Sequence, residues 1–283
     1  MTIVPFSHHN KSPVIPSEAE GPCVSIGAIH HMSPNPVIEF SNVSYRTADS
    51  RELIHQLNLT ILQGETLVLL GRSGSGKTTT LKLINNLLVP TEGELRVENK
   101  PTKDWDVIRL RRTIGYVIQE TGLFPHFTVA KNIGLVPSIE NWPKEKVEQR
   151  VSEMLQLVGL DAQLAKRYPR ELSGGQRQRV GVARALAADP PILLMDEPFG
   201  ALDPITRAEL QHEFIALQQR LRKTVVFVTH DLREALLLAT RIALMEEGKL
   251  VALLSPKEFL QSPDPLVKKY VAAFGNGELT RTP

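Results

Sequence analysis

A glycine-rich loop between a short apolar run and a candidate helix constrains this chain more than any other feature. The run Thr66–Leu70 leads into the loop GRSGSGKT, and helical spacing follows over Lys77–Leu88. Glycines in such a loop let backbone N–H groups turn inward around phosphate oxygens, and the helix N-terminus adds a favourable dipole. The lysine of this motif reaches the β- and γ-phosphates, and the threonine hydroxyl ligates magnesium. The residues predicted to bind the nucleotide here are Gly71, Arg72, Ser73, Gly74, Ser75, Gly76, Lys77, Thr78 and Thr79.

Strand-like and helical patterns alternate along most of the remaining chain. Val37–Val43 and Leu57–Leu62 alternate apolar and polar residues, as half-buried strands do. Later strand-like runs are Thr113–Ile118, Ile192–Asp196, Thr224–Thr229 and Arg241–Met245. Strands that alternate with helices indicate a parallel sheet covered by helices. We therefore predict an α/β fold with a parallel-sheet core and an N-terminal antiparallel β part.

Three regions differ from this core. Residues 1–35 hold many prolines and no periodicity, which predicts a poorly ordered tail. Residues 120–170 carry helical patterns without a strand, which predicts a helical subdomain at about 120–185, inserted into a domain of residues 36–274. Two short helices are expected in 256–274, and residues 275–283 form a C-terminal tail.

Composition limits the class of protein. Lys plus Arg number 33 and Asp plus Glu 31, so the net charge of +2 argues against a dedicated nucleic-acid binder. The single cysteine, Cys23, permits no internal disulfide, which fits a reducing compartment. The sequence shows neither a signal peptide nor an uninterrupted apolar stretch of about 18 residues. A cytoplasmic protein is expected, and any membrane role requires a partner subunit.

An acidic pair ends one of the predicted buried strands. The sequence ILLMDE places Asp196 at the strand tip and Glu197 directly after it. In proteins with a phosphate-binding loop, the first acid suits the magnesium shell. Glu197 is then the candidate general base for the attacking water.

A second glycine-rich element, LSGGQ, precedes a predicted helix over Gln176–Ala188. Its residues Ser173, Gly174, Gly175 and Gln176 offer bare N–H groups and a hydroxyl, as a second phosphate-binding nest does. The alternative is an ordinary helix N-cap by Ser173. A second nest makes sense if it faces another nucleotide, because one loop already satisfies a triphosphate.

Together these motifs resemble the ATP-binding-cassette (ABC) ATPases over about Val37–Phe274. LSGGQ and the following RQRVGVARAL resemble that family's signature, and the sequence Ala-Leu-Asp at 201–203 resembles its D-loop. Gln119 and His230 follow predicted strands, as the family's Q-loop glutamine and switch histidine do. Tyr45 is similar to the aromatic that stacks under adenine. The resemblance implies the P-loop NTPase fold, ATP and Mg²⁺.

The resemblance also implies a mechanism. Two cassettes pair head to tail as a homodimer, so Ser173 and Gly175 of one chain contact the γ-phosphate held by Lys77 of the other. Magnesium sits on Thr78, Gln119 and Asp196. Glu197 deprotonates water, while His230 holds the γ-phosphate, and both are the expected catalytic residues. Gly174 and Gln176 complete the expected contact with the nucleotide.

The segment from Ile114 to Val129 resembles the importer ATPases for osmoprotectants such as glycine betaine, carnitine and choline. That resemblance implies integral membrane permease subunits, an extracytoplasmic solute-binding protein, no nucleic acid, and a peripheral position on the inner face of the cell membrane. Phe124, Pro125 and Phe127 are either exposed permease anchors or packing residues of the helical subdomain.

Two alternatives remain at this stage: an ATPase of another importer class, such as amino acids, or a soluble ABC ATPase without a transport role. One LSGGQ and a near-neutral charge argue against the second. Many osmoprotectant ATPases also carry C-terminal regulatory domains of the cystathionine-β-synthase type. The residues after Phe274 are too few for such a domain, which weakens the substrate assignment.

Overall fold

The computed structural model describes residues 1–2, 35–119 and 122–275. The chain divides into two compact units, Met1–Ser33 and Pro34–Pro283, and every element below belongs to the second. The tails predicted for residues 1–35 and 275–283, together with Cys23, fall almost wholly outside the described residues. Their extent stays a prediction.

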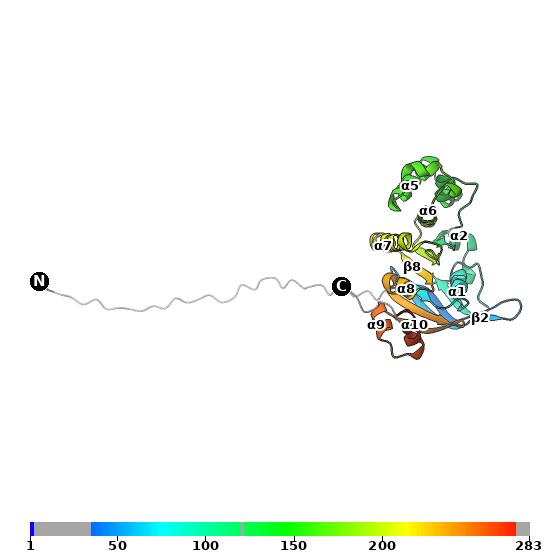
Figure 1. Ribbon diagram of the computed structural model, residues 1–283, viewed down its shortest axis with the longest axis vertical. Coiled ribbons are helices and arrows are strands. Elements are labelled where there is room, and N and C mark those ends of the chain that lie inside the picture. Colours follow the sequence, from blue (N-terminus) through cyan, green and yellow to red (C-terminus); the bar gives the residue numbers. More distant parts are fainter. Residues whose placement is uncertain (3–34, 120–121, 276–283) are drawn as a thin grey trace. The chain divides into compact units, whose positions relative to one another are not determined.

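Within the described residues of the second unit, ten strands build two sheets (Figure 1). Their bounds are β1 Pro36–Arg46, β2 Glu52–Leu62, β3 Thr66–Leu70, β4 Glu92–Val97, β5 Lys100–Pro101, β6 Ile114–Val117, β7 Ile192–Asp196, β8 Thr224–Thr229, β9 Arg241–Glu246 and β10 Lys249–Leu254. An antiparallel sheet has the order β2-β1-β4-β5, and the larger sheet has the order β10-β9-β3-β8-β7-β6. In the larger sheet β9, β3, β8, β7 and β6 are parallel, and only β10 runs against its neighbour. The predicted parallel core and antiparallel β part are confirmed.

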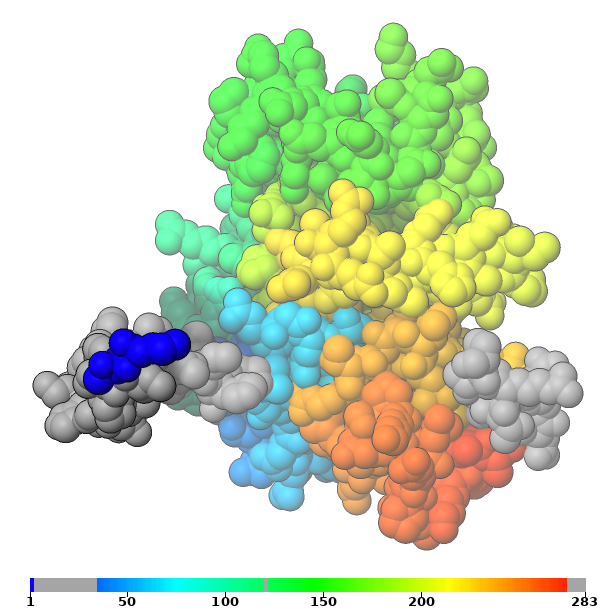
Figure 2. Space-filling model, turned by 90° about the vertical axis from the view of Figure 1, so that its left-hand side faces the viewer, coloured from blue at the N-terminus to red at the C-terminus, as the bar shows by residue number. Residues whose placement is uncertain are grey.

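Helices connect these strands. Their bounds are α1 Lys77–Ile84, α2 Val107–Arg112, α3 Val129–Ile133, α4 Leu135–Ile139, α5 Lys144–Leu157, α6 Gly174–Leu186, α7 Pro204–Leu221, α8 Leu232–Leu238, α9 Pro256–Gln261 and α10 Pro265–Gly275, and short 3₁₀ turns occupy Thr102–Asp104, Ala162–Lys166 and Pro169–Glu171. Between β6 and β7, residues 122–170 hold helices and turns but no strand, as the sequence predicted. Figure 2 shows these residues, in green, on one side of the yellow α7, with α9 and α10 in orange to red on the opposite side.

Two hydrophobic cores lie on opposite faces of the larger sheet. Along β3, Val68 and Leu70 belong to one core, while Leu67 and Leu69 belong to the other. β7 and β8 alternate in the same way, because successive side chains of a strand point to opposite faces. Residues of α6, α7 and α8 fill the first core, whereas α1 and the antiparallel sheet fill the second. Strands buried on both faces explain why the runs read as nearly continuous apolar sequence.

Several predicted boundaries need correction. Helix α1 ends at Ile84 rather than Leu88, because Asn85 caps it and Asn86 takes a left-handed φ of 54°. Helix α6 begins at Gly174, two residues before the predicted start, and ends at Leu186. The sequence analysis missed β4, β10 and α2. None of the helices in the described part of the chain is long and apolar enough to span a bilayer.

Candidate nucleotide-binding site

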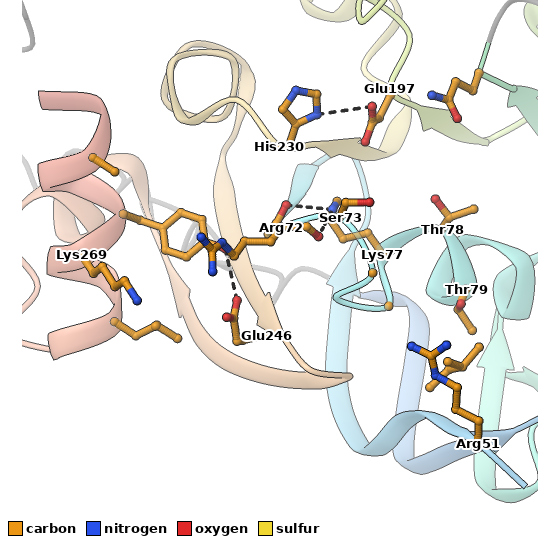
Figure 3. Close-up of a pocket in the computed structure, with 18 residues that line it drawn as sticks. Arg51, Arg72, Ser73, Lys77, Thr78, Thr79, Glu197, His230, Glu246 and Lys269 are labelled. Atoms are coloured by element: carbon orange, nitrogen blue, oxygen red, sulfur yellow. Dashed lines mark hydrogen bonds and ion pairs between the residues drawn. The ribbon is translucent and has the colours of Figure 1, made fainter.

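The candidate site lies at the carboxyl edge of the larger sheet. Leu70, the last residue of β3, pairs with Thr229, the last residue of β8. Asp196 ends β7 and pairs with Val228 of β8. The residues that follow these strands therefore meet at one edge, where ligands of open α/β sheets bind. A cavity of about 900 Å³ opens there (Figure 3).

The glycine-rich loop exposes an uncapped helix N-terminus to this cavity. Gly76 precedes α1 with a left-handed φ of 100°, and no side chain caps the helix. Gly71 has no room for a side chain, because a Cβ there would lie 2.4 Å from the Met245 carbonyl oxygen. The buried Ser75 hydroxyl has no hydrogen-bond partner among the described residues. The free N–H groups of this helix N-terminus fit a phosphate, whereas Ser75 is not among the residues that line the cavity.

Lys77 places its ammonium group inside the loop. The side chain is 4% exposed, and Nζ donates to the carbonyl oxygens of Gly71 and Arg72 at 2.8 Å each (Figure 3). Burial lowers the pKa of Lys77, and the charges of Glu197, Asp196 and Glu246 oppose that change. Carbonyl oxygens leave the positive charge unneutralised, so the loop is prepared for an anion.

Thr78 and Asp196 meet beside the loop. The Thr78 hydroxyl donates to Asp196 Oδ1 at 3.0 Å, and Asp196 is 5% exposed. Burial raises the pKa of Asp196, the Thr78 hydrogen bond lowers it, and the Glu197 charge raises it further. Burial next to Asp196 likewise raises the pKa of Tyr116. A hydroxyl and a carboxylate are oxygen ligands of the kind that Mg²⁺ prefers.

Glu197 faces His230 across the opening of the cavity. His230 Nδ1 lies 3.3 Å from Glu197 Oε2, and the two side chains are 62% and 24% exposed (Figure 3). Glu197 has a left-handed φ of 44°, which is unusual for a residue with a long side chain. Its N–H donates to the Val228 carbonyl, which holds this conformation in place. Gln119 lines the same cavity.

The residues of the LSGGQ segment have two different surroundings: one lines a cavity, and others cap α6. Gly174 lines a second cavity of about 470 Å³ together with Gln119, Glu197 and His230. Ser173 caps α6: its Oγ accepts from the Gln176 N–H, and the Gln176 side chain accepts from the Ser173 N–H. The cap interpretation therefore holds within one chain. The Ser173 hydroxyl keeps its proton for a further acceptor.

The residues that line the large cavity differ in part from the predicted site residues. Tyr45 packs against the second core and is not among the residues that line the large cavity. Ser173, Gly175 and Gln176 also lie outside its lining. The sequence analysis missed lining residues from β2, β9, α10 and their ends: Arg51, Leu53, Glu246, Leu266, Lys269, Tyr270 and Ala273. Glu246 could have been expected, because it ends a strand of the same parallel sheet.

A phosphate-binding loop, an acidic strand end and a facing histidine at one sheet edge define a P-loop nucleotide-binding protein. Residues 54–200 match the family model of the ABC transporter, and the chain belongs to this family. The expected family membership is confirmed.

Curated relatives narrow the comparison. The choline transport ATP-binding protein OpuBA of Bacillus subtilis is 48% identical over 83% of this chain and 62% of its own length. The osmoprotectant import ATP-binding protein OsmV of Salmonella typhimurium is 50% identical over 78% and 57%, respectively. The glycine betaine uptake system ATP-binding protein YehX of Escherichia coli is 48% identical over 86% and 78%. The chain thus spans about three fifths of OpuBA and OsmV.

Solved structures share the fold. The protein cbiO1 of Clostridium perfringens, part of the ABC transporter complex cbiONQ, has a TM-score of 0.74 at 27% identity, over 85% of this chain and 96% of cbiO1. The ATP-binding cassette MJ0796, a dimer bound to ADP and phosphate, has a TM-score of 0.70 at 35% identity, over 77% of this chain and 98% of that cassette.

Proposed function

We propose that this protein hydrolyses ATP to energise an importer of osmoprotectants such as choline, carnitine and glycine betaine. The observation that carries the first part is the convergence of Lys77, Asp196, Glu197 and His230 on one uncapped helix N-terminus. The loop amides and Lys77 hold the β- and γ-phosphates. Glu197 accepts a proton from water, and His230 donates a hydrogen bond to the γ-phosphate. Phosphoryl transfer needs mainly this positioning and charge neutralisation.

Mg²⁺ fits beside Thr78 and Asp196, whose oxygen atoms already lie 3.0 Å apart. Gln119 lines the same cavity as Thr78 and offers a third oxygen. Mg²⁺ held by these residues would neutralise charge on the phosphates. Thr78 and Asp196 orient this corner of the site, and burial keeps competing water away from Asp196.

A second copy of the chain completes the proposed site. The cavity beside Gly174 is open and adjoins Glu197 and His230, and the cassette MJ0796 forms a dimer. Head-to-tail pairing would bring the α6 N-terminus of one chain, with the free proton of Ser173, to the γ-phosphate on the other. The same pairing would bring the amides of Gly174 and Gly175 and the side chain of Gln176 to that nucleotide.

The catalytic assignment is tested by Glu197→Gln, which keeps the shape of the side chain but cannot accept a proton. We expect kcat for ATP to fall about 10²–10⁴-fold, as for other positioned general bases, with ATP binding retained. Glu209→Gln, which alters an exposed carboxylate on α7, is the control and should keep its turnover. Wild-type turnover in Glu197→Gln would refute the base assignment. Undetectable ATPase activity in the purified wild-type protein would refute the proposed hydrolysis.

The importer assignment is supported by the three curated relatives and by an aromatic cluster before α3. Phe124 is 40% exposed, and its ring lies 5.3 Å from that of Phe127 and 6.0 Å from that of His126. Exposed clustered apolar groups mark interaction surfaces. We assign this cluster as the contact with the permease, on the cytoplasmic face of the membrane, and expect a solute-binding protein to deliver the substrate.

Transport assays separate the two parts of the proposal. A strain lacking this chain should lose uptake of labelled choline, carnitine or glycine betaine, and uptake of a polar amino acid should stay unchanged. Phe124→Ala should abolish uptake while the purified protein keeps its ATPase activity. Leu260→Ala, which shortens a comparably exposed apolar side chain on α9, is the matched control. Normal uptake with Phe124→Ala would refute the permease contact, and loss of amino-acid uptake alone would refute the substrate class.

A further inference from the structure

A buried carboxylate that the proposed chemistry does not use lies behind the site. Glu234, on α8, is 6% exposed. Its Oε2 accepts from the Thr229 hydroxyl at 2.5 Å, and its Oε1 accepts from the Gln211 side-chain amide at 2.9 Å. Burial raises the pKa of Glu234, while both hydrogen bonds and the charge of Arg207 oppose that rise. A carboxylate buried with two donors holds its neighbours in place, because an unpaired partner would cost free energy.

One end of this network fixes the segment that carries His230. Thr229 directly precedes His230, and its hydroxyl also accepts from the Asp231 N–H at 3.0 Å. The Thr229 hydroxyl therefore links the residue before His230 to the residue after it, and it is held in turn by Glu234. The His230 side chain is 62% exposed, and its Nδ1 lies 3.3 Å from Glu197 Oε2. The direction of His230 thus depends on how Thr229 is held.

The other end fixes the segment that follows Glu197. Arg207 lies one turn before Gln211 on α7 and donates to the carbonyl oxygens of Leu202 and Gly200, at 3.1 and 3.4 Å. Its Nε is buried and has no hydrogen-bond partner among the described residues. Residues 200–202 line the smaller cavity beside Glu197 and His230. One helix, α7, therefore joins these carbonyls to Glu234.

We propose that Glu234 and Gln211 are positioning residues that couple residues 229–231 to residues 200–202. The segment that carries His230 and the segment that follows Glu197 then move together. The inference rests on the proposed ATP hydrolysis, because Glu197 and His230 act in that reaction. It assigns no contact with ATP to either residue. A displacement of residues 200–202, where a second chain would approach, would thereby be transmitted to His230.

The test replaces Gln211 by Met, which keeps the side-chain length and removes the amide. We expect kcat to fall about tenfold, the effect of one hydrogen bond to a charged group on the barrier. The KM for ATP should stay within about twofold, because the loop that binds the phosphates is untouched. Gln218→Met is the matched control: Gln218 lies on the same helix and donates to the Lys223 carbonyl, away from Glu234. Its kcat should equal that of the wild type.

A second background separates positioning from a general structural effect. In His230→Ala, the further change Gln211→Met should lower kcat less than about twofold, because its effect acts through His230. A tenfold loss in that background would overturn the inference, as would unchanged turnover in Gln211→Met alone. Equal losses in Gln211→Met and Gln218→Met would also overturn it.

Amide hydrogen exchange gives a readout that does not depend on turnover. Exchange should rise together in residues 199–203 and 229–233 of Gln211→Met, and in neither segment of Gln218→Met. A rise in only one segment, or in neither, would overturn the coupling. If the wild-type protein fails to hydrolyse ATP, the proposed function fails, and the exchange result decides the inference alone.

Discussion

Asn132 holds the proposed permease surface in shape, and its removal makes the sharpest prediction. The side chain is fully buried on α3. Its Oδ1 accepts from the Phe124 N–H at 2.8 Å, and its Nδ2 lies within 3.1–3.2 Å of the carbonyl oxygens of Phe124, Phe127 and Thr128. One amide thus closes the loop that presents the aromatic cluster. The perturbation is Asn132→Ala.

The expected cost follows from counting what the amide can do. It accepts one hydrogen bond and has two protons for three carbonyls, so three hydrogen bonds are lost. At about 1 kcal/mol each, the free energy of unfolding should fall by about 3 kcal/mol. Asn58→Ala is the matched control: Asn58 also makes three hydrogen bonds, with Asn42 and Gln56, but it is exposed. Water replaces those bonds, so the cost should stay below about 0.5 kcal/mol.

Urea unfolding measures both variants. With a slope near 3 kcal/mol per molar, the midpoint of Asn132→Ala should fall by about 1 M and that of Asn58→Ala by less than about 0.2 M. The Phe124 amide should exchange faster in Asn132→Ala, and uptake should be lost while ATP binding is kept. Equal midpoints for the two variants would refute the reasoning that buried geometry, and not the number of hydrogen bonds, sets the cost.

Three further predictions concern the site. Lys77→Met should weaken binding of a fluorescent ATP analogue at least about tenfold, because an ammonium–phosphate hydrogen bond is lost; unchanged affinity would contradict the assigned role. Gly175→Ala should cost about 1–3 kcal/mol of unfolding free energy, because a Cβ there meets Thr206 at 2.7 Å, whereas Gly174→Ala has ordinary contacts and should cost less. Asp196→Asn, without Mg²⁺, should raise the unfolding free energy at neutral pH: burial raises the carboxyl pKa, so its charged form destabilises the fold. That gain should shrink as the pH falls through the raised pKa, and a pH-independent difference in urea titrations would contradict it.

The central residues of the candidate site could be predicted because their position depends on the order of strands, loops and helices along the chain. Lys77 and Thr78 begin α1 directly after a loop whose glycines predict a turn. Asp196 ends a strand, and His230 follows one, and both strands are recognisable from their apolar runs. In a parallel sheet, the carboxyl ends of strands share one edge, so residues far apart in sequence meet there. The structure places Gln119, Glu197 and His230 on one cavity with the loop, as that rule requires.

What the sequence analysis missed depends on tertiary packing. Tyr45, which is predicted to stack under adenine, pairs with β2 and packs against the second core. Arg51 and Leu53, which the sequence analysis did not single out, line the cavity. The role of Tyr45 stays a prediction. Lys269 and Tyr270 reach the cavity only because α10 packs against α8 and β9 ends nearby. The apolar residues of a short helix indicate which of its faces is buried, but they carry no local signal for the elements against which that face packs.

Several groups at this sheet edge lower the free energy of unfolding of the chain. Lys77 and Asp196 are buried with pKa values shifted toward their neutral forms, Glu197 keeps a left-handed backbone, and the Ser75 hydroxyl is unpaired among the described residues. The two buried charges of Lys77 and Asp196 destabilise the fold, and an anion with its metal would relieve both, since a phosphate pairs the ammonium and a cation pairs the carboxylate. Apolar residues of the same shape would make the fold at least as stable as these buried charged groups do. The buried charges therefore serve a purpose other than the stability of the fold. Binding of a nucleotide with its metal should therefore raise the free energy of unfolding.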